Sequence, residues 1–306
     1  MFRRLGLLIL LVSMSGGAIY AQTLPFRSYS IEQGLSESVV YDILQDHRDH
    51  LWIGTNYGLN RFNGISFRQY HVEDGLRGNS VTSLYEDDKR RLWVGSDQGV
   101  NLVRKDTLVT PSALTVLNGI QVNDIFQDET GRFWFATRGE GVFLWKEGAQ
   151  ALRRISLKDG LIGNRVREIA QDPDGSMWIA TREGLSHWRE GMIESFTTEH
   201  GLPNRMLRDI KFDQQGRMYI ATRGGLSIYY KGEFTNYTET DGLINDRIQS
   251  LSLDPDGGLW LGTEDGLSYF KEGNFQNYTA SQGLPNEILQ ATKVDREGNL
   301  WLVSFG

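Results

Sequence analysis

The chain of 306 residues contains no cysteine. It therefore has neither disulfide bonds nor a metal site built on thiolates. Its longest amino-terminal apolar run, from Leu5 to Val12, is far shorter than the ~20 residues that a membrane-spanning helix needs. Basic residues are the minority, with 32 Lys and Arg against 39 Asp and Glu. General binding to nucleic acid or to anionic membranes is therefore not expected, and stability has to come from packing.

The amino terminus predicts export. Arg3 and Arg4 precede the apolar run, and small residues lead from there to Ala21 and Gln22. This order is typical of a signal peptide at residues 1–21, cleaved after Ala21, and it predicts a periplasmic location. Cleavage would change the net charge from −7 to about −9, because the leader carries two arginines. An uncleaved anchor is the alternative.

Residues 22–306 are built from one repeated unit. A tryptophan or tyrosine recurs every 41 residues, with one interval of 44, and opens words such as Trp-Ile-Gly-Thr. The seven aromatic residues are Trp52, Trp93, Trp134, Trp178, Tyr219, Trp260 and Trp301. An aspartate stands six positions before each of them, at 46, 87, 128, 172, 213, 254 and 295. An aliphatic residue stands twelve positions before each, at Val40, Val81, Val122, Val166, Leu207, Ile248 and Leu289.

Each unit predicts four short strands. The aliphatic segment is followed by a hairpin turn, in which the Asp caps the backbone and a glycine such as Gly175 or Gly257 supplies positive φ. The aromatic word is the second strand, and two further strands follow a second glycine turn. Four strands in about 40 residues are typical of a propeller blade. The sequence therefore predicts an all-β fold, a seven-bladed β-propeller of four-stranded antiparallel blades.

The two ends predict how the ring closes. Phe26–Tyr29 has the pattern of Phe67–Tyr70 and lies 41 residues before it. We therefore expect the N-terminal segment to pair in the last blade, which contains Trp301. The sequence stops at Gly306, where a third strand of that blade should begin. This indicates a truncated seventh repeat and a longer polypeptide.

The word Trp-Ile-Gly-Thr-x-x-Gly-Leu, with Asp-x-x-Gly before it and Asp-Gly-Leu after it, resembles the two-component-regulator propeller repeat. The resemblance covers nearly all of the chain after residue 21. It implies the periplasmic sensor of a hybrid histidine kinase, responding to an oligosaccharide and acting with downstream domains of the same polypeptide. No cofactor is expected.

The sequence assembles no catalytic or metal site. Its five histidines (His47, His50, His71, His187 and His200) occupy different repeat positions and are not expected to converge. Asp172–Gly175 and Asp254–Gly257 begin like a calcium loop but lack its later ligands, so they are predicted to be turns.

Arginines recur at two positions that should meet at one mouth of the channel. Arg138, Arg182 and Arg223 follow the aromatic residue by four, whereas Arg167 and Arg208 follow the aliphatic residue by one. Because a guanidinium holds carboxylate or sulfate in a planar fork, these five predict a site for an acidic sugar. Asn79, Asn123 and Tyr57 would orient its hydroxyl groups. The alternative is that the arginines pair with loop acids such as Glu140, Glu168, Glu183 and Asp209.

Three functions fit these patterns. A ligand-binding sensor is the first. A propeller enzyme similar to the streptogramin lyases is the second, but it needs a histidine base and a metal ion on the loop face. A non-catalytic scaffold that forms homodimers through its flat faces is the third.

Overall fold

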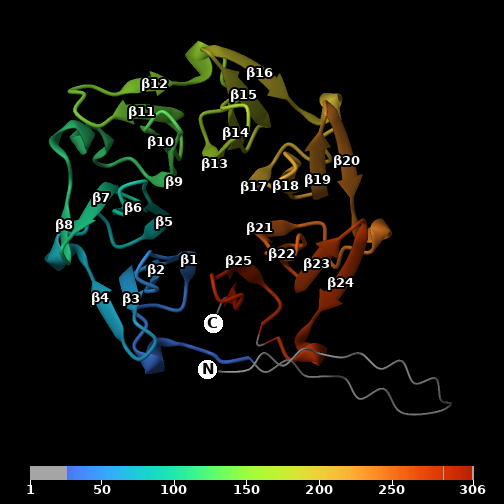
Figure 1. Cartoon of the computed structure of the whole chain (residues 1–306), viewed down its shortest axis with the longest axis horizontal. Coiled ribbons are helices and arrows are strands. Elements are labelled where there is room, and N and C mark those ends of the chain that lie inside the picture. The colour runs from blue at the N-terminus through green and yellow to red at the C-terminus, as the bar shows by residue number, and fades with distance from the viewer. Residues whose placement is uncertain (1–25, 285, 305–306) are drawn as a thin grey trace.

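The computed structural model describes residues 26–284 and 286–304, so the predicted signal peptide at 1–21 lies outside the described residues. The sheets are arranged radially around a central channel (Figure 1). Six blades are four-stranded antiparallel sheets, in which the first strand along the chain lines the channel and the fourth lies at the circumference. No helix in the described ranges is long and apolar enough to cross a membrane.

The strands of the six blades are β1–β4 (Val40–Gln45, Leu51–Thr55, Gly58–Phe62, Phe67–Tyr70), β5–β8 (Val81–Glu86, Leu92–Ser96, Gly99–Arg104, Thr107–Val109), β9–β12 (Val122–Gln127, Arg132–Thr137, Val142–Lys146, Arg153–Ile155), β13–β16 (Val166–Gln171, Met177–Thr181, Leu185–Arg189, Met192–Phe196), β17–β20 (Leu207–Phe212, Met218–Thr222, Gly225–Tyr230, Glu233–Tyr237) and β21–β24 (Ile248–Leu253, Leu259–Thr263, Leu267–Lys271, Asn274–Tyr278). Short 3-10 helices precede the repeats: η1 (Ile31–Gln33), η2 (Val72–Asp74), η3 (Ser112–Leu117), η4 (Leu157–Asp159), η5 (Thr198–His200), η6 (Glu239–Asp241) and η7 (Ala280–Gln282).

The prediction of seven four-stranded blades is wrong. The described residues form six, and the seventh repeat contributes a two-stranded sheet of β25 (Leu289–Val294) and β26 (Leu300–Ser304). The segment Phe26–Tyr29 forms no strand. In the other six sheets the fourth strand pairs with the third, and the described residues of this sheet include no third strand. It is held by side chains instead: the Tyr29 ring lies 5.1 Å from Phe62 and 5.9 Å from Trp301, between centroids.

The aspartate of each repeat ties its hairpin to the aromatic residue. In blade three, the Trp134 indole donates to Asp128 Oδ2 at 2.8 Å, while Asp128 Oδ1 accepts backbone N–H groups from the turn. The same side-chain bond occurs in all seven repeats, with Tyr219 in place of tryptophan in the fifth. The predicted left-handed glycines are also confirmed, with φ of 86° at Gly175 and 82° at Gly257.

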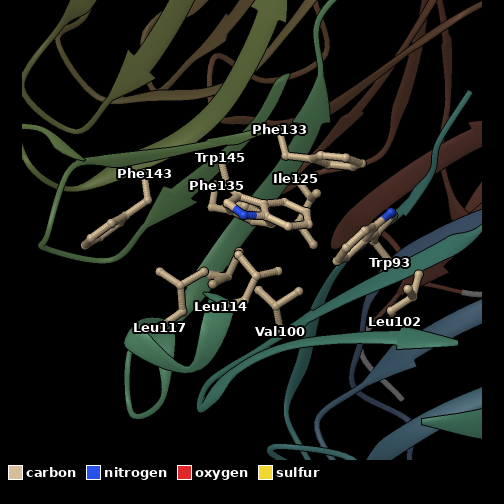
Figure 2. Packing of buried hydrophobic residues seen from close by; sticks show 11 residues of the cluster. Trp93, Val100, Leu102, Leu114, Leu117, Ile125, Phe133, Phe135, Phe143 and Trp145 are labelled. Atoms are coloured by element: carbon tan, nitrogen blue, oxygen red, sulfur yellow. The ribbon is translucent and has the colours of Figure 1, made fainter. Parts of the chain in front are cut away.

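Apolar side chains fill the spaces between adjacent blades. Figure 2 shows the contact between blades two and three, where Trp93 of β6 lies beside Ile125 and the aromatic rings of β10 and β11. The Trp93 and Phe133 ring centroids are 4.7 Å apart, and both side chains are buried. Burying a side chain of this size contributes roughly 1.5–3 kcal/mol. Packing between blades therefore holds a ring that has no disulfide.

A β-bulge near the start of each innermost strand shapes the channel. In β13, for example, the register with β14 shifts between Val166 and Glu168. The shift recurs in the innermost strand of all seven sheets. Because a bulge inserts an extra residue on one strand, two successive side chains can face the same side. Both Arg167 and Glu168 therefore line the channel.

Candidate anion-binding site at the channel mouth

The central channel holds a cavity of about 1160 Å³. Its walls come from the innermost strands of all seven sheets, together with the turns between the second and third strands of three blades. The side chains from those turns are Asn56, Asp97 and Arg138, and they mark the mouth of the channel on the side of the loops between blades. Equivalent positions in successive repeats therefore supply most of the polar side chains that line the cavity.

The structure brings the five predicted arginines together on this side, and we call them the arginine cluster. Arg167 and Arg208 are the second residues of β13 and β17, whereas Arg138, Arg182 and Arg223 directly follow β10, β14 and β18. Arg138, Arg167 and Arg208 line the cavity. Arg182 and Arg223 meet Arg167 and Arg208 around a small adjoining pocket.

None of the four acids that were expected as alternative partners forms an ion pair with these arginines within the described residues. Glu140 pairs with Arg154, and Lys211 pairs with both Glu168 and Asp209. The Glu183 Oε2 atom is buried without a hydrogen-bond partner. Among the described residues, the arginine cluster makes one ion pair, at 3.7 Å between Arg223 and Glu264. The cluster is therefore left with excess positive charge.

The pKa values of two of these arginines reflect the excess positive charge. Burial, and after it the neighbouring Arg208, Arg182, Arg138 and Arg223, lower the pKa of Arg167 from 12.5 to about 10. Burial and the adjacent guanidinium groups also lower the pKa of Arg208. Like charges held together at a partly buried site disfavour their own charged form. A bound anion would relieve this repulsion.

The three predicted neutral residues are placed differently. Asn123 lines the cavity, where its Nδ2 donates to Val166 O at 2.7 Å and its Oδ1 accepts from Gln121. Asn79 Oδ1 accepts the Val72 N–H at 3.2 Å in the loop before blade two. Tyr57 is 52% exposed. Neither Asn79 nor Tyr57 belongs to the described cavity lining.

A second layer of charge was missed from the sequence. We call Asp42, Asp124, Glu168 and Asp209 the carboxylate belt; each follows the aliphatic residue of its repeat by two positions and lines the cavity. Three of them accept a backbone N–H from the next blade at 2.7–2.8 Å. The recurrence of acids at this position could have predicted the belt. Strict alternation of side chains along a strand, however, would turn this position away from the channel.

Burial changes the ionisation of the belt. It raises the pKa of Asp42 and of Asp124 to about 6. Burial, and then the nearby Asp124 carboxylate, raises the pKa of Glu168 well above its usual range. Lys211 Nζ donates to Glu168 Oε1 at 2.7 Å and to Asp209 Oδ1 at 2.6 Å. One lysine is therefore shared between two carboxyls.

The described cavity lining contains no histidine. His187 lies at the opposite end of its blade, where its ring stacks on Trp178 at 4.0 Å between centroids and its Nε2 contacts Ser176. No group of three His, Asp or Glu side chains in residues 26–284 and 286–304 is arranged to hold a metal ion. What the cavity offers is charge and hydrogen bonding.

The radial four-stranded sheets and the repeated Trp–Asp bond define a β-propeller protein. The family model of the two component regulator propeller matches five segments, 34–57, 75–98, 116–139, 160–183 and 242–265. These repeats are therefore two component regulator propeller repeats, which confirms the resemblance of the sequence. No match was found among the curated proteins.

Several solved structures are similar. The extracellular domain of a protein described as a hybrid two component system from B. thetaiotaomicron aligns with a TM-score of 0.82 and 25% identity over 90% of this chain and 39% of that one. A second extracellular domain from that organism, described as part of a one component system, has a TM-score of 0.76 and 25% identity over 89% of this chain and 38% of that one. This chain thus spans less than half of either domain.

Virginiamycin B lyase from Staphylococcus aureus aligns with a TM-score of 0.69 over 88% of this chain and 94% of the lyase. Its identity is 13%, so this likeness shows the fold alone.

Proposed function

We propose that this chain is an extracytoplasmic ligand-binding sensor region of a two-component signalling protein, and that its ligand is an oligosaccharide carrying carboxylate or sulfate groups. The observation that carries the proposal is the arginine cluster, whose five guanidinium groups share one ion pair at 3.7 Å among the described residues. A protein with a net charge of −7 has many acids available to neutralise these arginines. Excess positive charge at the mouth of a large cavity therefore favours an external anion.

The sensor part of the proposal is supported by the similar extracellular domains of B. thetaiotaomicron and by the family of the repeats. The predicted signal peptide supports an extracytoplasmic location. Signalling output would come from other domains of the same polypeptide, which are the expected partners. The propeller itself would contribute recognition.

The chemistry of the lining supports a sugar. Arginine forks hold carboxylate or sulfate through two parallel hydrogen bonds. Elsewhere in the lining of the same cavity, Gln249 and Gln290 from β21 and β25 and the exposed Tyr41 offer neutral donors, acceptors and an aromatic face. A small number of polar groups around a cavity is typical of a site that fixes the orientation of a ligand.

Calorimetric titration with lactose 3′-sulfate, an oligogalacturonate and neutral lactose tests the proposal. The two anions should bind and neutral lactose should bind far more weakly. Arg182→Ala/Arg208→Ala should cost about 2–4 kcal/mol of binding free energy, since hydrogen bonds to charged groups are worth about 1.5–3 kcal/mol each.

The matched control is Arg104→Ala/Arg153→Ala, which removes two exposed arginines outside the cavity lining. This control should bind like the wild type. Equal binding of lactose and its sulfate, or equal losses in both double variants, would contradict the proposed site.

A further inference from the structure

Acidic and basic side chains alternate along the channel wall. Glu168 directly follows Arg167 in β13, and Asp209 directly follows Arg208 in β17; all four line the same cavity. Successive residues of a strand are about 3.3 Å apart along its axis. An anion on these arginines would therefore share one cavity with the carboxylate belt. Charges that share a partly buried cavity interact more strongly than charges separated by bulk water.

The four carboxyl groups of the belt outnumber the cationic side chains that pair with them. Lys211 serves Glu168 and Asp209 together. Asp42 Oδ2 and Asp124 Oδ2 each accept one backbone N–H, and neither residue forms an ion pair within 4 Å in the described part of the chain. Lys293 attracts Asp42 from a longer distance. The belt therefore keeps negative charge when all its members are ionised.

The titratable and charged groups that face the belt come from six of the seven innermost strands. They are Tyr41 and Asp42 from β1, Tyr85 and Glu86 from β5, Asp124 from β9, Arg167 and Glu168 from β13, Arg208, Asp209 and Lys211 from β17, and Lys293 from β25. Asp97 and Arg138, from the turns at the channel mouth, line the same cavity. The residues of β21 that line the cavity are neutral. Glu86 is paired with His47, away from the arginine cluster.

Burial prepares the belt to take up protons near neutral pH. It raises the pKa of Asp42 and Asp124 to about 6, and that of Glu168 well above its usual range. The belt therefore loses negative charge as the pH falls from about 8 to about 5. A sulfate ester stays fully ionised over this whole pH range.

We propose that anion binding at the arginine cluster is coupled to proton uptake by the carboxylate belt, so that the site binds its ligand more tightly at mildly acidic pH. The coupling rests on the proposed function, because it needs an anion at this site. An ionised carboxylate repels the bound anion, whereas a protonated carboxyl does not. Linkage is reciprocal, so the bound anion also increases the proton affinity of the belt.

The probe is lactose 3′-sulfate, because its charge is constant over the pH range of the test. Calorimetric titration of the whole chain should give affinity about tenfold higher at about pH 5.5 than at about pH 8. At about pH 6.5, titrations in two buffers of different ionisation enthalpy should show net proton uptake on binding. In Asp124→Asn/Glu168→Gln, the pH dependence of the affinity and the proton uptake should both fall to less than about half, and the remainder should come from Asp42. The side-chain amide introduced at position 124 keeps an oxygen that can accept the Ile169 N–H.

The control is Asp256→Asn on the exposed hairpin between β21 and β22, which should keep the full pH dependence. If the double variant does not fold, Asp42→Asn alone should lower the proton uptake measurably, since it removes one titrating group. Binding of equal strength at both pH values would overturn the coupling and leave the proposed function standing. No binding at either pH would overturn the proposed function, and the coupling with it.

Discussion

Replacing Arg167 with methionine should make the protein more stable while removing its ligand binding. The guanidinium lies among four others, and its pKa falls from 12.5 to about 10 through burial and these neighbours. A fall of this size corresponds to about 3 kcal/mol of unfavourable free energy in the charged form. Because the side chain is partly exposed, solvent screens part of this cost, and we expect a net gain of about 1–2 kcal/mol in unfolding free energy.

The assay is urea unfolding of the wild type, Arg167→Met and a matched variant, Arg132→Met. Arg132 donates to Asp128 at 2.8 Å and lies over the Trp134 ring, so its loss should destabilise the fold by about 1–3 kcal/mol. Arg167→Met should also lose affinity for lactose 3′-sulfate, whereas Arg132→Met should retain it. If Arg167→Met is destabilised by more than about 1 kcal/mol, its guanidinium belongs to a structural network, and the reasoning about excess charge fails.

Three further predictions concern the fold. Asp128→Ala should lower the unfolding free energy by about 2–4 kcal/mol, because several buried donors lose their acceptor. A double-mutant cycle with Trp134→Phe should give a coupling energy above about 0.5 kcal/mol. Additive effects of the two substitutions would contradict a stabilising bond between Trp134 and Asp128. Gly257→Ala should cost about 1 kcal/mol from positive φ alone, while Gly225→Ala should cost more, because its new Cβ would meet the Tyr237 carbonyl oxygen; equal melting temperatures would refute this. Stability should also peak at mildly acidic pH. The two belt aspartates with raised pKa contribute stability that is fully present below about pH 4 and is lost as the pH rises through about 6, whereas the hairpin aspartates with lowered pKa contribute stability that is lost below about pH 4. A melting temperature that rises steadily from about pH 5 to about pH 8 would contradict the first of these contributions.

The repeat register was readable in the sequence because each unit solves the same local problem. Its aromatic residue needs an acceptor for the indole N–H, and its hairpin needs a cap, so Asp recurs six positions earlier. The same register placed the five arginines of the cluster correctly on one side of the ring. The number of four-stranded blades was wrong because a fourth strand depends on a third as its neighbour. Phe26–Tyr29 has the right pattern, but β26 offers it no adjacent described strand.

The carboxylate belt was missed because it depends on a bulge. Perfect alternation would turn Arg167 and Glu168 to opposite faces of β13. The register shift before Glu168 lets both side chains line the channel. The local sequence of a single repeat does not predict this shift. The partner of Glu168 could not be predicted either, since Lys211 comes from a neighbouring blade. Pairing between blades requires knowledge of the ring geometry.

The central claim is that the arginine cluster binds an external anion. Crystals grown without sulfate or phosphate and soaked in selenate test it most directly, because selenium can be located by anomalous scattering. The account predicts a selenium peak within hydrogen-bonding reach of the Arg167 and Arg208 guanidinium groups, and no such peak in crystals of Arg182→Ala/Arg208→Ala. Finding these guanidinium groups closed in bidentate pairs with neighbouring acids, with no anion beside them, would contradict the claim.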